Sequence, residues 1–235
     1  MTHHVHPHIF RIGETTTWKS RWFHRKKFQA YLREDTLLRE WLKQRLATLR
    51  VSSVEIERSP NTMTLVIKTA RPGILIGRGG EGIGRLKADI EKKIRILACE
   101  RRPGITGAPE RRELKLTIEE VRSPETDAHV VAEEIREDIE KRVRFRRILK
   151  QTIDRVASHK EVQGVKVMLS GRLDGAEMSR EQWLKRGRIP LQTLRASIDY
   201  ALIEAQTTYG TIGIKVWIYK GDVFEKEKEK VESRK

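Results

Sequence analysis

The stretch 73-GILIGRGGEGIG-84 decides the fold, because six glycines fall within twelve residues at the start of a segment with helical periodicity. Gly77, Gly79 and Gly82 fit G-x-G-x-x-G, the turn that holds the phosphates of a dinucleotide. Residues 77–80 (GRGG) also fit G-x-x-G, a loop that clamps the backbone of a nucleic acid. The first pattern predicts an enzyme with a nucleotide cofactor, and the second predicts a protein that binds RNA.

The segments around the glycines favour the clamp. A dinucleotide site needs a buried strand that ends at its first glycine, and an acid about 20 residues further on. Two alternating segments, 51–58 and 62–70, precede the loop instead, and only residues 73–76 could supply the missing strand. Glu100 lies near the right distance, but no apolar strand leads to it. No G-K-S or G-K-T follows, so the sequence has no P-loop. A third interpretation, in which the glycines only permit a tight turn, stays open.

The order of elements over residues 35–121 agrees with the clamp. Apolar residues at helical spacing predict a helix over 35–49, with Asp35 as its N-cap. Two strands joined by a turn come next, then the glycine loop, a helix over 83–98 and a strand over 113–121. Because glycine has no Cβ, a phosphate can approach such a loop closely, and the N-terminus of the following helix attracts it.

The second half of the chain predicts helices followed by a sheet. Residues 127–158 are helical, but their apolar stripe shifts near 143–145, which indicates two helices. Alternation predicts strands over 164–173 and 212–220, whereas residues 191–210 fit helix and strand alike. We therefore predict an α+β protein, with a C-terminal α/β domain in which a mixed or antiparallel sheet packs on helices.

The composition indicates a polyanionic partner. The chain has 235 residues, with 49 Lys and Arg against 33 Asp and Glu, a net charge of +16. Such an excess repels itself in a compact fold, and nucleic acid is the favoured partner. We expect no membrane partner, because no apolar run could span a bilayer, and no secretory signal. The lone Cys99 suits a reducing cytoplasm. We expect no metal at the four N-terminal histidines, since no Cys or acid completes a site: His3, His4, His6 and His8.

A second cationic element lies in residues 141–160, which hold eight Lys or Arg and one acid, Asp154. If the second helix buries its apolar face, Arg147 points outward with Arg146 and Lys150 at its flanks. Acids are too few to pair with these cations along the helix, and each cation can neutralise a phosphate. Arginines alternate with glycines further on, and we predict phosphate contacts from Arg172, Arg180, Arg186, Arg188 and Arg195.

The chain resembles a known family. Helix-strand-strand-loop-helix-strand with I-x-I-G-x-x-G is similar to a type II (prokaryotic) KH domain. The whole chain resembles bacterial small ribosomal subunit protein three, the S-three family, over these stretches: 5–13, 69–81, 141–150, 170–180, 186–200 and 207–221. We accordingly expect four parts, which are a basic N-terminal arm (1–17), a KH domain (18–122), a C-terminal ribosomal RNA-binding domain (123–221) and a charged, disordered tail (222–235).

The resemblance implies a structural constituent of the small ribosomal subunit in the cytoplasm and not an enzyme. It implies binding to small-subunit ribosomal RNA and to mRNA, with Arg146, Arg147 and Lys150 lining the mRNA entry tunnel and assisting unwinding. It implies neighbouring proteins S ten and S fourteen, and neither a cofactor nor a small-molecule substrate. Gly77, Arg78, Gly79 and Gly80 would form the clamp, although the family often has two basic residues where this chain has Arg78 and Gly79. The loop 99–112 looks longer than usual for the family. A free-standing KH regulator of RNA is the alternative.

Overall fold

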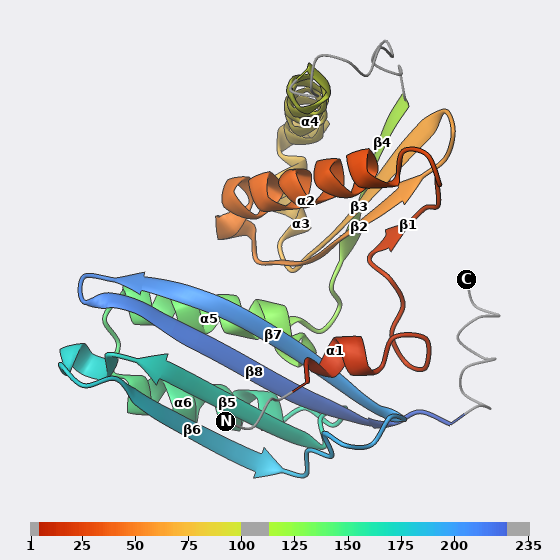
Figure 1. Cartoon of the computed structure of the whole chain (residues 1–235). Helices are drawn as coiled ribbons and strands as arrows, with labels where there is room; N and C mark the ends of the chain where they lie inside the picture. Colours follow the sequence, from red (N-terminus) through yellow and green to blue (C-terminus); the bar gives the residue numbers. More distant parts are fainter. Residues whose placement is uncertain (1–4, 100–112, 225–235) are drawn as a thin grey trace. The chain divides into compact units, whose positions relative to one another are not determined.

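The computed structural model describes residues 5–99 and 113–224, which belong to two compact units. We call Trp18–Arg122 the central unit. We call Met1–Thr17 together with Ser123–Lys235 the terminal unit. The chain thus begins in the terminal unit, forms the central unit and then returns (Figure 1).

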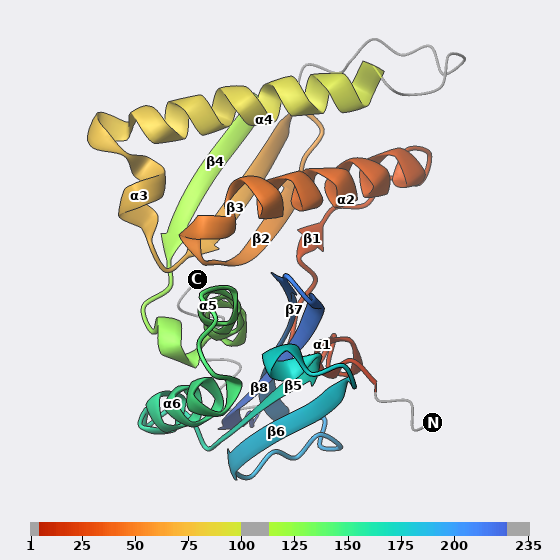
Figure 2. The same cartoon turned by 90° about the vertical axis from the view of Figure 1, so that its left-hand side faces the viewer.

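The central unit is a four-stranded mixed sheet with helices on one face (Figure 2). The strand order is β1-β2-β3-β4, in which β2 and β3 are antiparallel while β3 and β4 are parallel. Its elements are β1 (Ser20–Arg21), α2 (Phe28–Arg45), η1 (Ala47–Leu49), β2 (Val51–Arg58), β3 (Thr62–Thr69), α3 (Pro72–Ile76), η2 (Arg78–Gly80), α4 (Glu81–Cys99) and β4 (Glu113–Glu120). Parallel neighbours need a crossover, and α3, the glycine loop and α4 belong to it.

The core of the central unit follows from the sequence periodicity. Met63, Leu65 and Ile67 alternate along β3 and are buried, as predicted. Leu38 of α2 and Ile90 of α4 are fully buried against the same face of the sheet. The predicted helix-strand-strand-loop-helix-strand order is therefore confirmed.

The start of α2 differs from the prediction. The helix begins at Phe28, and Asp35 is buried in its interior instead of acting as the N-cap. The guanidinium group of Arg58 binds the Asp35 carboxylate, which also accepts hydrogen bonds from Ser20 Oγ (2.9 Å) and Trp22 Nε1 (2.7 Å). A buried carboxylate needs such partners, and they come from distant segments that helical periodicity cannot reveal.

The terminal unit is a four-stranded antiparallel sheet with order β6-β5-β8-β7. Its elements are α1 (Pro7–Phe10), η3 (Pro124–Thr126), α5 (Ala128–Glu140), α6 (Phe145–Ala157), β5 (Gly164–Gly171), η4 (Leu173–Gly175), β6 (Arg180–Gly187), β7 (Ala196–Thr207) and β8 (Gly210–Asp222). Helices α5 and α6 pack on one face through a single apolar core (Figure 1). The α+β prediction is confirmed, as is the break between two helices near residue 143.

The N-terminal segment is anchored to the terminal unit. Arg11 is fully buried, and its guanidinium group donates hydrogen bonds to the carbonyl oxygens of Leu191 (2.8 Å) and Thr193 (3.0 Å). The His6 ring packs edge-on against Tyr200. This described part of the predicted arm is therefore held by its own fold, whereas His3 and His4 lie outside the described residues.

A carboxylate in β7 helps to fix this region. Asp199 accepts a hydrogen bond from the Ala128 amide (2.9 Å) and lies near His8 (3.3 Å) and Lys220 (3.8 Å). Burial raises the pKa of Asp199, but its His8, Lys220 and Ala128 contacts together outweigh burial and lower the pKa to about 2. The ionised carboxylate therefore stabilises the terminal unit.

Neither a membrane span nor a metal cluster is found in residues 5–99 and 113–224. No helix there has the length and apolarity needed to cross a bilayer. No three His, Cys, Asp or Glu side chains there gather into a group that could hold a metal ion.

Candidate nucleic-acid interface

The glycine loop is built on a backbone that only glycine adopts easily. Helix α3 ends at Ile76, and Gly77, Gly79 and Gly80 then have positive φ angles of 69°, 62° and 81°. A Cβ on Gly79 or Gly80 would meet no other atom within 4 Å. Glycine is therefore favoured at these two positions by the left-handed conformation and not by lack of space.

Close packing between two helices fixes the position of the loop. A Cβ on Gly82, near the start of α4, would lie 2.4 Å from the Leu75 carbonyl oxygen. Only glycine allows α4 to approach α3 so closely (Figure 2). Residues 73–76, the only candidate for a dinucleotide-site strand, are part of α3, so the dinucleotide interpretation is wrong.

The loop presents a basic group beside the N-terminus of a long helix. Arg78 is exposed and forms no ion pair with any residue that the structure describes. Glu81 opens α4, and its carboxylate pairs with Arg85 one turn later, at the exposed surface. The arrangement suits the approach of a phosphate to the exposed loop. The RNA contacts of Gly77, Arg78, Gly79 and Gly80 stay predictions.

The second cationic element lies at the N-terminal half of α6. Arg146, Arg147 and Lys150, which we call the α6 ridge, are exposed, while Ile148 and Leu149 face the core. The three cations are neighbours at i, i+3 and i, i+4 spacing, and none forms an ion pair with a described residue. The sequence thus correctly predicted the outward orientation of this ridge, and its contact with mRNA stays a prediction.

The α6 ridge opposes the stability of its own helix. A helix N-terminus is electropositive, and cations there cost about 0.3–1 kcal/mol each. The first turn of α6 nevertheless has no acid, and the N-cap, Arg144, makes no side-chain capping hydrogen bond. The like charges also repel each other across one turn. An arrangement that lowers the stability of the free helix is understandable if a polyanion binds there.

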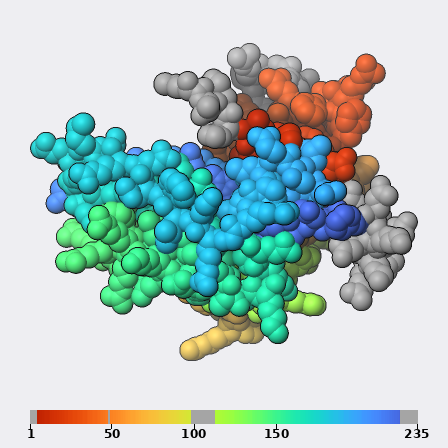
Figure 3. All heavy atoms as spheres, turned by 90° about the horizontal axis from the view of Figure 1, so that it is seen from below, coloured from red at the N-terminus to blue at the C-terminus, as the bar shows by residue number. Residues whose placement is uncertain are grey.

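The remaining predicted arginines lie on β6 and in the segment after it. Arg180, Arg186, Arg188 and Arg195 are exposed. The segments that carry them, β6 and the loop after it, lie on the face of the terminal unit that Figure 3 shows. Arg186 pairs with Asp154 (3.1 Å). The structure brings Arg188 and Arg195 together at Asp222, at 3.9 and 3.6 Å.

Arg172 has a different environment from the other predicted arginines. Its Nε donates to the Ala176 carbonyl (2.9 Å) and its Nη1 donates to the Tyr209 carbonyl (3.4 Å). The side chain therefore holds the loop after β5 to the β7–β8 hairpin. This role was not visible in the sequence, because the two carbonyls lie on segments far apart in the chain.

Two further segments of the prediction, the basic loop 99–112 and the charged but near-neutral tail 222–235, lie outside the described residues except at Cys99 and at 222–224. In contrast, the basic turn before α6 is described and extends the cationic surface through Arg142 and Arg144, both exposed. Sequence reasoning counted these arginines but assigned them no role. The signal that could have found them is the run KRVRFRR, which begins at Lys141.

A mixed sheet with a G-x-x-G turn between two helices, together with a separate unpaired cationic ridge, defines an RNA-binding protein of the KH class. Comparison with known families agrees. Residues 37–126 match the KH domain family, and residues 135–218 match the family described as ribosomal protein S3, C-terminal domain.

The relatives extend this match to nearly the whole chain. The small ribosomal subunit protein uS3 of Desulfovibrio desulfuricans is 45% identical over 95% of this chain and 97% of its own length. The uS3 proteins of Caldicellulosiruptor saccharolyticus and Pseudothermotoga lettingae are 47% and 46% identical, each over 93% of this chain and over 92% and 97% of their own lengths. The chain therefore belongs to the uS3 family, whose members are ribosomal structural proteins and not enzymes.

Proposed function

We propose that this protein is a structural component of the small ribosomal subunit, in the cytoplasm, that binds small-subunit ribosomal RNA and helps to form the mRNA entry path. The observation that carries the proposal is the α6 ridge, whose three exposed cations have no ion partners among the described residues. Two of them, Arg146 and Arg147, lie in the first turn of α6, the end of a helix that disfavours cations. A bound RNA strand compensates this cost because each phosphate neutralises one cation.

The glycine loop of the central unit supplies a separate RNA contact. Its backbone is open on the side of Gly79 and Gly80, where nothing lies within 4 Å of an added Cβ. With one cation in the clamp, at Arg78, the electrostatic part of this contact is weaker than in a loop with two. The exposed arginines of the terminal unit, Arg180, Arg186, Arg188 and Arg195, then add phosphate contacts to ribosomal RNA.

Protein neighbours are the best explanation of one more surface. The sheet face of the terminal unit opposite α5 and α6 carries Trp183 and Leu202, which are 52% and 54% exposed. The two side chains lie on the two edge strands, in one row across the sheet with Met168 and Lys215 between them. Large apolar side chains exposed on one face suit a protein contact better than water. We place the neighbouring proteins S ten and S fourteen, which the family resemblance implies, at this face.

The α6 ridge acts mechanically on mRNA. The sequence has no P-loop, so the energy for opening an mRNA duplex comes from translocation by the ribosome. Arg146, Arg147 and Lys150 hold the separated strand through its phosphates and so disfavour re-pairing. Such contacts are independent of base sequence, as an entry path for every message requires.

The test is translation by small subunits that carry Arg146→Ala, Arg147→Ala and Lys150→Ala together. We expect assembly to persist, and elongation to slow on messages with stable hairpins but not on unstructured ones. A matched variant that removes three exposed cations of the central unit (Lys43→Ala, Lys92→Ala, Arg95→Ala) should translate both messages normally. Equal rates on both messages for the ridge variant would show that the entry-path role is wrong.

A further inference from the structure

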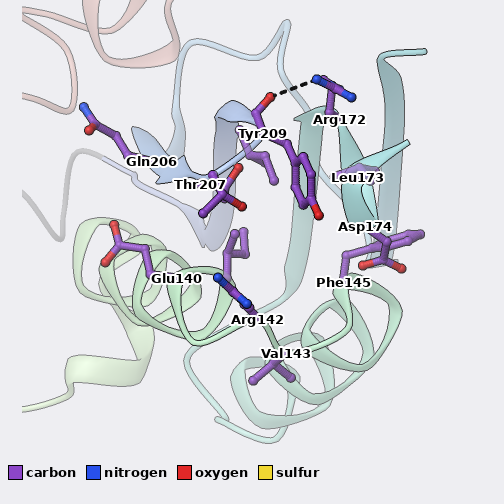
Figure 4. A pocket seen from close by; sticks show the side chains of 14 residues that line it. Glu140, Arg142, Val143, Phe145, Arg172, Leu173, Asp174, Gln206, Thr207 and Tyr209 are labelled. Carbon is purple, nitrogen blue, oxygen red and sulfur yellow. Dashed lines mark hydrogen bonds between the residues drawn. The ribbon is translucent and has the colours of Figure 1, made fainter. Parts of the chain in front are cut away.

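A pocket of about 390 Å³ opens in the terminal unit beside the α6 ridge. Three segments form it, which are the α5–α6 turn, η4 and the β7–β8 hairpin (Figure 4). Its volume lies in the range of sites that hold one small ligand group. The sequence alone does not reveal this pocket, because its three segments are more than 25 residues apart along the chain.

Arg142 enters the pocket from a strained position. The amide of Arg142 bonds to the Ile139 carbonyl (2.9 Å), and the amide of Val143 bonds to the Asp138 carbonyl (3.0 Å). These bonds form a Schellman motif that ends α5, in which the left-handed position is usually glycine. Arg142 occupies that position with φ = 60°, which carries a backbone strain that glycine avoids.

The backbone at Arg142 serves the end of α5, but the Arg142 side chain adds nothing to the fold that would favour arginine over glycine there. The Arg142 guanidinium group is exposed and makes no hydrogen bond or ion pair with residues 5–99 or 113–224. A side chain placed at a strained position, and not used by the fold, indicates use by a ligand.

An aromatic ring stands across the pocket from Arg142. Tyr209, at the tip of the β7–β8 hairpin, is 58% exposed. Arg172 holds it in place, because Arg172 donates a hydrogen bond to the Tyr209 carbonyl and its guanidinium group lies 5.7 Å from the ring centre (Figure 4). A fixed ring with an open face is a platform on which a base can stack.

The pocket is continuous with the α6 ridge. Phe145 lines the pocket, and the guanidinium group of Arg146 lies 5.8 Å from the centre of the Phe145 ring. A strand held on the ridge by its phosphates therefore passes the mouth of the pocket.

The charges of the pocket select among anionic ligands. Two acids, Glu140 and Asp174, line it together with Arg142 and Arg172. The lining is thus close to neutral and disfavours a free nucleotide with several negative charges. One nucleotide of a strand has a single charge, and its 2′-hydroxyl can donate a hydrogen bond to a carboxylate.

We propose that this pocket takes one nucleotide of single-stranded RNA, whose base stacks on Tyr209 and whose phosphate pairs with Arg142. The proposal rests on the proposed function, since the same strand occupies the α6 ridge. It adds a site for a base to a surface that otherwise binds only phosphates. It also assigns to Arg142 the role of a ligand-binding residue whose backbone strain is kept for that purpose.

The test uses the full chain and a short unstructured RNA oligonucleotide, with affinity measured by fluorescence anisotropy. Arg142→Gly removes the guanidinium group and relieves the strain, so we expect about tenfold weaker binding and a Tm higher by roughly 2–4 °C. Tyr209→Ala should weaken binding by about tenfold as well. The matched control is Lys92→Ala, which removes an exposed cation of the central unit that lies outside the α6 ridge and does not line the pocket.

A crosslinking arm locates the base. RNA that contains 4-thiouridine should crosslink to the peptide with Tyr209, and Arg142→Gly should reduce that product. The proposal is overturned if Arg142→Gly binds RNA no more weakly than Lys92→Ala, or if no crosslink forms on the β7–β8 hairpin.

The two proposals fail in different ways. If Arg146→Ala, Arg147→Ala and Lys150→Ala abolish binding while the pocket variants bind normally, the ridge stands and the pocket proposal is wrong. If the pocket variants weaken binding and the ridge variant does not, the pocket stands and the ridge is wrong. A mononucleotide that binds as tightly as the oligonucleotide contradicts the proposal, because the pocket would then take free nucleotides.

Discussion

Gly82 and Gly84 lie two residues apart in α4, and replacing each by alanine should change the stability of the central unit in opposite directions. A Cβ at position 82 would lie 2.4 Å from the Leu75 carbonyl oxygen and 2.8 Å from that of Ile76. Both atoms belong to the backbone of α3, so an ordinary contact of 3.4 Å requires α3 to move by about 1 Å. Overpacking of this kind costs about 1–3 kcal/mol. A Cβ at position 84 would meet nothing within 4 Å, so Gly84→Ala should gain roughly 1 kcal/mol from helix propensity.

The assay is hydrogen exchange during a urea titration of the full chain, read on peptides from β3 and α4, because the two units need not unfold together. We expect the free energies of opening for the two variants to differ by about 2–4 kcal/mol, with wild type between them. Gly82→Ala should also weaken RNA binding, since it displaces the clamp residues between α3 and α4. The reasoning fails if Gly82→Ala is as stable as Gly84→Ala.

Three further outcomes follow from the charges and the backbone. Replacing Arg146, Arg147 and Lys150 by alanine should reduce the slope of log affinity against log salt for single-stranded RNA by about 2, and should raise the free energy of unfolding by up to about 1 kcal/mol. Unchanged slope in a salt titration would contradict the phosphate contacts. Because the pKa of Asp199 is lowered to about 2, its stabilisation is complete above about pH 4 and is lost as pH falls through 2. Asp199→Asn should therefore cost about 2 kcal/mol at pH 7 and only about 0.4 kcal/mol at pH 2, where the carboxylate is half protonated, and equal loss at both pH values in urea titrations would refute this assignment. Gly79→Lys should tighten RNA binding and steepen its salt slope by roughly 0.7, at about 1 kcal/mol of backbone strain, and an unchanged slope would argue against RNA at the clamp.

The sequence predicted those helices and strands in which the order of apolar residues matches the pattern of buried residues. In β3, every second residue is buried, so alternation alone identified the strand and its inward face. In the helical segment 127–158, the shift of the apolar stripe located the break, because α5 and α6 each bury a face of their own.

The parts of the fold that the sequence did not predict depend on contacts with residues far away in the chain. All eight residues of β6 are exposed, so no alternation marks this strand, and its backbone pairing with β5 defines it. Residues 196–207, which fit helix and strand alike, form β7 because β8 pairs with them along their whole length. The burial of Arg11 depends on carbonyl groups about 180 residues away.

Some features of the candidate site could likewise be predicted from the sequence, and others depend on tertiary contacts. Exposure of the α6 ridge followed from spacing, because the apolar residues of one helix determine which residues face outward. The use of Arg172 as a support for Tyr209, and the left-handed backbone of Arg142, depend on tertiary contacts and a cap geometry that spacing does not encode.

The central claim is that the surplus cations are gathered on surfaces that touch RNA. The most direct measurement is protein–RNA crosslinking, read by mass spectrometry, on small subunits assembled with this protein. We predict crosslinks to ribosomal RNA from the peptide with residues 77–80, and crosslinks to mRNA from the peptide with residues 146–150. Crosslinks from both peptides to neighbouring proteins alone, with no attached nucleotide, would contradict the account.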